Sequence, residues 1–177
     1  MDEFVSKYVN RLGSKGRVSI PAAFRQILAR DGYDNLFCSP SLEMDCVDAG
    51  GQGLRSAIDD YLNAFEVFSE EREILATTLL GESEALKMDK DGRVVLSETL
   101  KGHAGIDDKV AFVGNGFKFQ IWNPERYETY RSDAVERARA LRKSLTAQRQ
   151  TSRMARVAQP STAQSSLGSK RDGEGAE

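Results

Sequence analysis

The chain has 177 residues, 40% of them hydrophobic and 29% charged, which is the composition of an ordinary globular protein. No apolar run approaches the ~20 residues of a membrane-spanning helix, and no basic leader precedes an apolar segment, so we expect neither a membrane span nor a secretory signal. The two cysteines, Cys38 and Cys46, fit no metal motif and are too few for a disulfide framework, which favours a reduced cytosolic setting.

The net charge of −2 conceals a strong segregation of charge along the chain. Residues 1–30 carry six Lys or Arg against two Asp or Glu, and residues 31–86 carry two against thirteen. Residues 87–130 balance at seven each, and residues 131–177 carry ten basic and five acidic groups. We interpret the acidic middle as a solvated helical face. The total charge argues neither for nor against a nucleic-acid partner, so the local distribution of charge must decide between them.

One segment of the sequence occurs twice, at residues 12–21 and again at residues 88–97. Both copies share a central Gly-Arg-Val, flanked by apolar residues at matching positions. We place Gly16 and Gly92 in tight turns that require positive φ, and we count Asp89 among the turn-forming residues. Each copy predicts the order strand, turn, strand, short helix, strand, turn, strand.

In the first copy the short helix begins near Pro21 and ends at Asp31 and Gly32. Strands are expected at residues 35–38 and 42–47.

In the second copy Ser97 is expected to cap a short helix that Gly102 ends early. Strands at residues 109–113 and 117–122 follow, joined by a turn that contains Asn-Gly, a strong hairpin signal.

Two amphipathic helices are predicted between the copies, because apolar residues recur there at helical spacing. Their apolar positions, which we interpret as a packing face, are Leu54, Ile58, Tyr61, Leu62, Phe65, Ile74, Leu75, Leu79 and Leu80. A last helix is expected from Asn123 and Pro124 to about Leu145, followed by a polar tail that we predict to be disordered.

The predicted fold class is therefore mixed α+β, mostly β with flanking helices. The expected divisions are a first module at 4–53, a helical connector at 54–81, a second module at 82–128, a C-terminal helix at 129–145 and a disordered tail at 146–177.

Basic residues gather around the first Gly-Arg. Four of them fall within eleven positions without an acidic residue among them: Lys7, Arg11, Lys15 and Arg17. In the second copy the positive charges of Lys87, Lys90 and Arg93 are offset by Asp89 and Asp91. An arginine beside a turn can grip a phosphate or a guanine edge with two parallel hydrogen bonds, and a lysine is a less directional phosphate contact. The simpler interpretation, in which glycine makes the turn and arginine merely follows it, remains open.

Catalytic motifs are absent from the sequence. His103 is the single histidine and lies near a helix end, where a surface or capping role is expected. The adjacent pairs Asp59-Asp60 and Asp107-Asp108 point in different directions and form no acid–base dyad. No phosphate-cradling loop is present, and we expect no enzyme, no cofactor, no metal and no small-molecule substrate.

At the repeated Gly-Arg segments the sequence resembles the MraZ family, transcriptional regulators made of two AbrB-like swapped-hairpin modules. The match spans about residues 4–130 and includes residues 19–25, the closing residues 119–123, and Arg126. The resemblance implies tandem half-repeats that interlock into one β-barrel-like unit. It further implies a ring-shaped homo-oligomer that binds short direct repeats in double-stranded DNA upstream of its own gene, in the division and cell-wall gene cluster. The implied location is the cytoplasm, in association with the nucleoid.

The family motif is an aspartate, three residues, then an arginine in each copy. Asp89 and Arg93 match it, whereas the first copy has Arg17 with Gly13 at the aspartate position. Ser14 is a candidate stand-in through a turn hydrogen bond. The predicted DNA-binding residues are Arg17, Arg93, Lys15, Arg11, Lys7 and Lys90.

Two other functions stay open. One is an antitoxin-like module that binds a protein toxin through its C-terminal segment and also binds its own operator; the other is a ring-forming scaffold whose basic edge is incidental. The basic segment after Arg131 adds non-specific attraction for DNA or only keeps the protein in solution, and its dispersed charges favour the second interpretation.

Overall fold

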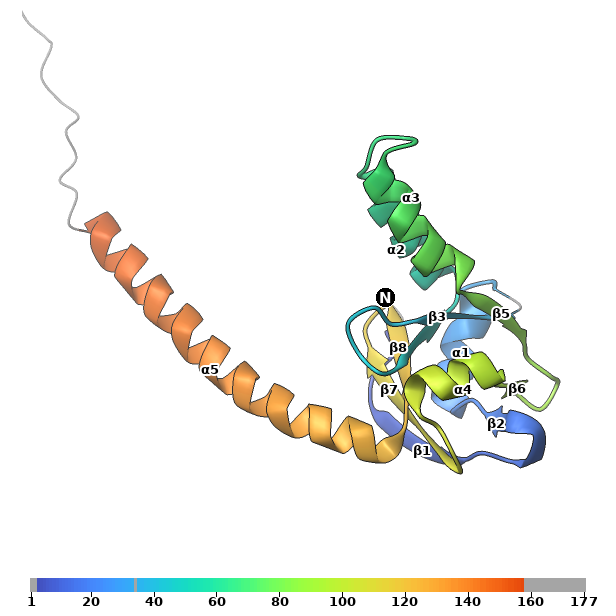
Figure 1. Ribbon diagram of the computed structural model, residues 1–177. Helices are drawn as coiled ribbons and strands as arrows, with labels where there is room; N and C mark the ends of the chain where they lie inside the picture. Colours follow the sequence, from blue (N-terminus) through green and yellow to red (C-terminus); the bar gives the residue numbers. More distant parts are fainter. Residues whose placement is uncertain (1–2, 34, 158–177) are drawn as a thin grey trace, which may run out of the picture. The chain divides into compact units, whose positions relative to one another are not determined.

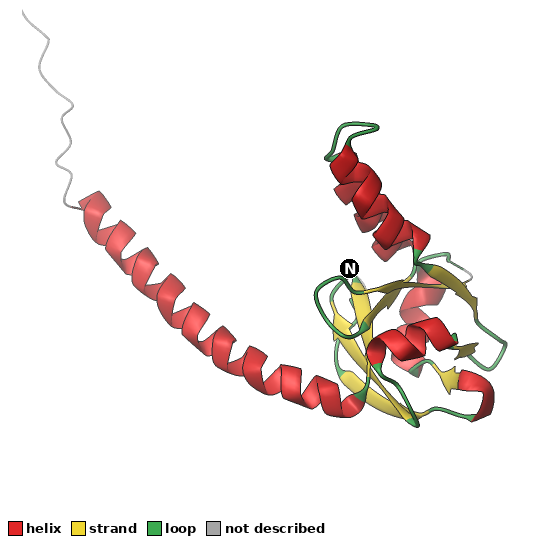
Figure 2. Ribbon diagram, viewed as in Figure 1, coloured by secondary structure: helices red, strands yellow, loops and turns green. Residues whose placement is uncertain are grey.

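The computed structural model describes residues 3–33 and 35–157. The chain forms two compact units, residues 1–132 and residues 133–177, and one long helix continues from the first into the second. Figure 2 shows the strands, all in the first unit, with short helices packed around them.

The first copy contains the expected order of elements (Figure 1). They are β1 (Lys7–Arg11), the 3₁₀ turn η1 (Ser14–Gly16), β2 (Arg17–Ser19), α1 (Ala22–Arg30), β3 (Asn35–Pro40) and β4 (Val47–Gly50). The connector is made of α2 (Gln52–Asn63), α3 (Glu70–Ala76) and the π-helical turn η2 (Thr77–Gly81).

The second copy repeats that order, which confirms the predicted α+β class. Its elements are β5 (Glu84–Lys87), β6 (Arg93–Val95), α4 (Glu98–Ala104), β7 (Lys109–Asn115) and β8 (Lys118–Trp122). Helix α5 (Pro124–Val157) follows, and the Asn123 side-chain oxygen caps it by accepting from the backbone N–H groups of Glu125 and Arg126.

The strands of the two copies are interleaved. A six-stranded antiparallel sheet has the order β1-β7-β8-β4-β3-β5, and a separate two-stranded sheet pairs β2 with β6. Only β3–β4 and β7–β8 are hairpins within a copy; the ladders β1–β7, β2–β6, β3–β5 and β4–β8 each join one copy to the other. The interlocking that the family resemblance implies is therefore present.

One core lies between the sheets and draws on both copies. Val18 and Val94 contribute from the two-stranded sheet, and Phe112 and Phe119 from the larger one. Phe24 of α1 is fully buried among them and makes edge and tilted ring contacts with Phe4, Tyr8 and Phe119. Burial of such a ring stabilises a fold by about 1.5–3 kcal/mol, so α1 is firmly attached to the sheet.

The connector helices form a smaller cluster over β3. Leu54, Ile58 and Leu62 of α2 are buried there together with Phe37. The predicted packing face is thus confirmed for these residues, whereas Tyr61 and Ile74 on the same predicted stripe are exposed.

Two local predictions are wrong. Residues 42–47 were expected to be a strand, but β4 begins only at Val47, because the Ser41 N–H donates to the Cys46 carbonyl and closes a loop. Helix α4 does not stop at Gly102; it continues to Ala104 and ends at Gly105, which takes the left-handed conformation that glycine tolerates. Ser97 caps its first turn as expected.

Helix α5 extends beyond its predicted end at Leu145, through residues 146–157 of the predicted disordered tail. Residues 125–157 contain no Gly or Pro and are rich in Arg and Ala, which are good helix formers. The low apolar content that suggested disorder removes a packing face but not helical propensity. The rest of the predicted tail, residues 158–177, lies outside the described residues.

Both cysteines are free thiols buried in the first unit. Desolvation by burial raises the pKa of Cys46 to about 12 and raises that of Cys38 as well. Neither thiol has the ionised character of a reactive cysteine, so both are packing residues.

Candidate nucleic-acid interface

The two repeated arginines meet on one small sheet. In the β2–β6 ladder Arg17 lies opposite Val95, Val18 opposite Val94, and Ser19 opposite Arg93. Because the two valines face the core, alternation along each strand directs Arg17 and Arg93 to the outer face. They are diagonal neighbours across the ladder, a placement that typically separates side chains by about 7–8 Å.

Neither arginine lies at the tip of a hairpin, because β1 does not pair with β2 and β5 does not pair with β6. Each lies at the start of a strand, directly after the turn of its copy, and each strand pairs with the other copy. One chain presents both guanidinium groups on a single surface as a result.

Reciprocal hydrogen bonds hold the two turns on either side of this ladder. The Leu96 N–H donates to the Gly16 carbonyl at 2.9 Å, and the Ile20 N–H donates to the Gly92 carbonyl at 2.9 Å. The equivalence of these bonds gives the site an approximate internal two-fold symmetry.

Both turns depend on glycine. Gly16 and Gly92 have φ values of 72° and 76°, the conformation that the sequence predicts for them. A Cβ on Gly16 would lie 2.6 Å from the Leu96 carbonyl oxygen, and one on Gly92 would collide with the Arg25 side chain. The Arg25 Nη1 group donates to the Asp91 carbonyl at 3.1 Å, so a helix of the first copy buttresses the turn of the second.

Carboxylates hold the arginine of the second copy. Asp89 accepts from the backbone N–H groups of Asp91 and Arg93 through Oδ1, both at 2.9 Å, and from Arg93 Nε through Oδ2 at 3.0 Å. Arg93 Nη2 is 2.5 Å from Asp91 Oδ2. The backbone N–H of Arg93 is the largest cause that lowers the pKa of Asp89 below its ordinary value, so the carboxylate stays ionised and fixes the turn and the guanidinium together.

The first copy lacks both of these carboxylates. Gly13 stands at the position of Asp89 and Lys15 at that of Asp91. Within residues 3–33 and 35–157, the Arg17 side chain has no ion pair or hydrogen bond, and no hydrogen bond from Ser14 replaces the missing aspartate. Lys15 adopts φ 61°, which a non-glycine residue rarely does. The site is thus symmetric in backbone and asymmetric in charge, with its uncompensated positive charge on the first copy.

Comparison with known proteins identifies relatives over most of the chain. A family model described as "MraZ protein, putative antitoxin-like" matches residues 79–150. A protein named Transcriptional regulator MraZ from Beijerinckia indica is 53% identical over 145 residues, which cover 82% of this chain and 88% of that protein. The chain belongs to the MraZ family. A protein of the same name from Xanthobacter autotrophicus is 54% identical over 82% of this chain and 92% of its own length. Another from Rickettsia felis is 36% identical over 82% of this chain and 97% of its own length. Their shared name is that of a regulator, in agreement with the expectation that the chain is not an enzyme.

In this MraZ family member, most predicted DNA-binding residues surround the β2–β6 ladder. One hollow beside it is lined by Arg11, Gly13, Ser14, Lys15, Arg17, Ser19 and Arg93. Lys90 lies on the exposed turn that joins β5 to β6 and so precedes one strand of this ladder. Lys7 does not join this group, because it lies at the far end of β1 from Arg11, forms an ion pair with Glu128 and sits 5.3 Å from the Tyr127 ring centre.

Three residues of the site were not predicted from the sequence. The sequence places Asp91 in a turn dipeptide and among the charges that offset its neighbours, and it places Ser19 and Arg25 in the segment that resembles the family, but it assigns none of the three to the site. Arg25 reaches the turn of the other copy, and nothing in sequence spacing indicates that contact. The position of Asp91 one residue before the second Gly-Arg was the available signal for its bond to Arg93.

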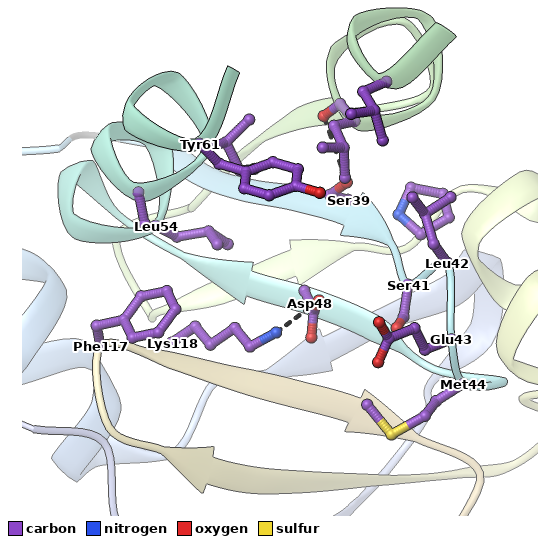
Figure 3. Close-up of a pocket in the computed structure, with 15 residues that line it drawn as sticks. Ser39, Ser41, Leu42, Glu43, Met44, Asp48, Leu54, Tyr61, Phe117 and Lys118 are labelled. Atoms are coloured by element: carbon purple, nitrogen blue, oxygen red, sulfur yellow. Dashed lines mark hydrogen bonds and ion pairs between the residues drawn. The ribbon is translucent and has the colours of Figure 1, made fainter. Parts of the chain in front are cut away.

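A second hollow lies between the connector helices and the loop that follows β3 (Figure 3). Its volume is about 310 Å³, and its walls include Leu54, Tyr61 and Phe117. Lys118 and Asp48, which also line it, form an ion pair with Nζ 2.7 Å from Oδ2. This apolar hollow has none of the unpaired basic groups of the β2–β6 face.

The described residues contain no group of three or more His, Cys, Asp or Glu side chains that could hold a metal ion. His103 is half-buried and its Nε2 lies 3.1 Å from the Ser41 carbonyl oxygen, so it bridges α4 to a loop. No helix in the described part of this MraZ family member is long and apolar enough to cross a membrane.

Proposed function

We propose that this chain is a sequence-specific DNA-binding transcriptional regulator whose contact surface is the outer face of the β2–β6 ladder. The observation that supports this most is the pairing of two arginines on one exposed face, one uncompensated and one held by carboxylates. Uncompensated cations suit the phosphates of a polyanion, and an ordered guanidinium beside them suits the edges of its bases.

The two halves of the site have different roles in this proposal. Arg11, Lys15 and Arg17 supply phosphate contacts, which makes affinity depend strongly on salt. Arg93 is held in a fixed orientation by Asp89, so it is the better candidate for a bidentate base contact, for which about 1–3 kcal/mol of discrimination is typical. Lys90 adds a phosphate contact from the adjoining turn, and Lys7 contributes only if it leaves Glu128.

One ladder offers few contacts, so useful affinity requires several copies. We infer that the chain forms a ring-shaped homo-oligomer that engages phased direct repeats upstream of its own gene, in the division and cell-wall cluster. Linked sites then act through their effective local concentration, and the assembly binds far better than one subunit does. Association with the nucleoid in the cytoplasm belongs to the same proposal.

The test is a titration of duplex DNA from the region upstream of its own gene, measured by anisotropy against a scrambled duplex. The Arg17→Ala variant should weaken binding to both duplexes because it removes a phosphate contact, and Arg93→Ala should lose most of the preference for the upstream duplex. The matched control is Arg72→Ala, which removes the same charge from α3, on the connector that projects away from the ladder (Figure 1). Unchanged affinity in Arg17→Ala, or equal losses in Arg17→Ala and Arg72→Ala, contradicts the assignment.

The antitoxin-like alternative draws support from the description of the matching family model. A toxin-wrapping segment would carry acidic and apolar anchors, whereas residues 146–157 contain no acidic residue and few large apolar ones. A wild-type protein that ignores the upstream duplex even in dilute buffer would favour this alternative or the scaffold over DNA binding.

A further inference from the structure

The C-terminal half of α5 concentrates positive charge. Residues 137–157 contain seven Lys or Arg and no Asp or Glu, and every residue from 137 to 156 is exposed. In a disordered tail the positive charges of this segment would be dispersed. In α5 the helical backbone holds them at fixed angles around the helix axis.

The angles place most of the arginines in one stripe. At about 100° per residue, Arg142, Arg149, Arg153 and Arg156 fall within an arc of about 60°. The last three also line one shallow hollow with Leu145, Gln148 and Ser152. We call these four residues the α5 arginine stripe.

The stripe has no negative partners of its own. Arg137 lies 3.5 Å from Asp133, but in the described part of the chain no carboxylate pairs with any of the four stripe residues. Arg149 and Arg153 are four residues apart, and Arg153 and Arg156 are three apart, spacings at which like charges destabilise a helix. Binding of a polyanion relieves that repulsion.

We propose that the α5 arginine stripe binds the phosphate backbone of duplex DNA independently of base sequence. This deepens the proposed function and rests on it, because it gives the regulator a second contact whose role is affinity rather than selection. The stripe spans about 21 Å at 1.5 Å per residue, enough to follow several successive phosphates.

The same helix is poorly suited to the other common polyanion, an anionic membrane. Helices that lie in a membrane interface have a face of Trp, Phe and Leu opposite their cations. Along the stripe, from Arg142 to Arg156, Leu145 and Met154 are the only large apolar residues. DNA, which needs cations but no apolar face, fits the observed composition.

The test compares two triple variants of the full chain with the same change in charge. The stripe variant is Arg149→Gln, Arg153→Gln and Arg156→Gln; the control is Arg137→Gln, Arg139→Gln and Lys143→Gln, which lie off the stripe. Glutamine is a good helix former, and circular dichroism verifies that helix content is kept. Binding to a scrambled duplex is measured as a function of salt concentration.

Each phosphate contact contributes about 0.9 to the magnitude of the slope of log binding constant against log salt concentration. The stripe variant should therefore lower the magnitude of this slope by about two to three, and the control variant should lower it by less than one. An unchanged slope in the stripe variant overturns the inference, and so does an equal loss in both variants. Loss of binding to phosphatidylcholine–phosphatidylglycerol vesicles with duplex binding intact overturns it in favour of a membrane. A wild type that binds the upstream and scrambled duplexes equally would contradict the proposed sequence-specific function. If the stripe variant still lowered the salt slope in that case, the proposed contact between the α5 arginine stripe and DNA would remain supported.

Discussion

Gly16 and Gly92 occupy equivalent turns, but their surroundings differ. Alanine at Gly16 meets a backbone oxygen that cannot move without breaking the Leu96–Gly16 hydrogen bond, whereas alanine at Gly92 meets only the flexible Arg25 side chain. Both replacements also strain a positive φ, which costs about 1–3 kcal/mol. We therefore expect Gly16→Ala to lower the free energy of unfolding more than Gly92→Ala, as measured by urea denaturation.

Gly102→Ala is a suitable control for those variants. Gly102 is inside α4 with open space around it, so alanine should stabilise the protein by about 0.5–1 kcal/mol through helix propensity. A Gly16→Ala variant as stable as the wild type would show that the turn can relax away from Leu96.

The carboxyl group of Asp89 should titrate below its ordinary value of 3.8. A lowered folded-state pKa means that the contribution of Asp89 to stability is present above the unfolded value and is lost as the pH falls through the folded value. The window for this loss therefore lies below about pH 4. The measurement is an NMR titration of the Asp89 carboxyl carbon.

The Arg93→Gln variant separates the causes of that shift. The backbone N–H of Arg93 remains in the variant and is the largest cause, so the pKa of Asp89 should rise only part of the way. A return to the ordinary value would mean that the guanidinium, rather than the turn backbone, holds the carboxylate.

At the scale of elements, local patterns predicted the order and type of most segments. The Gly-Arg turns, the Ser97 cap and the Asn115-Gly116 turn carry their conformation in a few adjacent residues. Ladder partners could not be predicted in this way, because alternation shows which face of a strand is buried and not which strand lies beside it. That is why the common face of Arg17 and Arg93 emerged only from the pairing of β2 with β6.

Two of the three errors of extent, in residues 42–47 and at the end of α5, have separate physical causes. Residues 42–47 alternate like a strand, but a hydrogen bond between Ser41 and Cys46 closes them into a loop. In α5 the apolar residues end near Leu145 while helix formers continue, so a criterion based on burial stops the helix too early. The sequence thus indicated the basic segment but not the alignment of its arginines.

At the scale of the whole molecule, neither copy has a complete fold of its own. Four ladders join the copies, and the core residues Phe24 and Phe119 come from different copies and touch each other. Separating the copies would expose strand edges and one side of the core at once. Cooperative folding of residues 1–132 as one body is therefore expected, with the connector acting as a tether between the halves.

A cut in the α2–α3 loop tests this interdependence. Val67 and Phe68 are 71% and 87% exposed there, so fragments 1–67 and 68–177 divide the chain without removing a buried group. Each fragment alone should lack a cooperative urea transition, because four of the six ladders join strands that the cut separates. Mixed, the fragments should associate and shift the emission of Trp122, the single tryptophan, which is 2% exposed in the folded protein. A cooperative transition in fragment 1–67 alone would show that the first copy is an independent module, and the shared-core account would then be wrong.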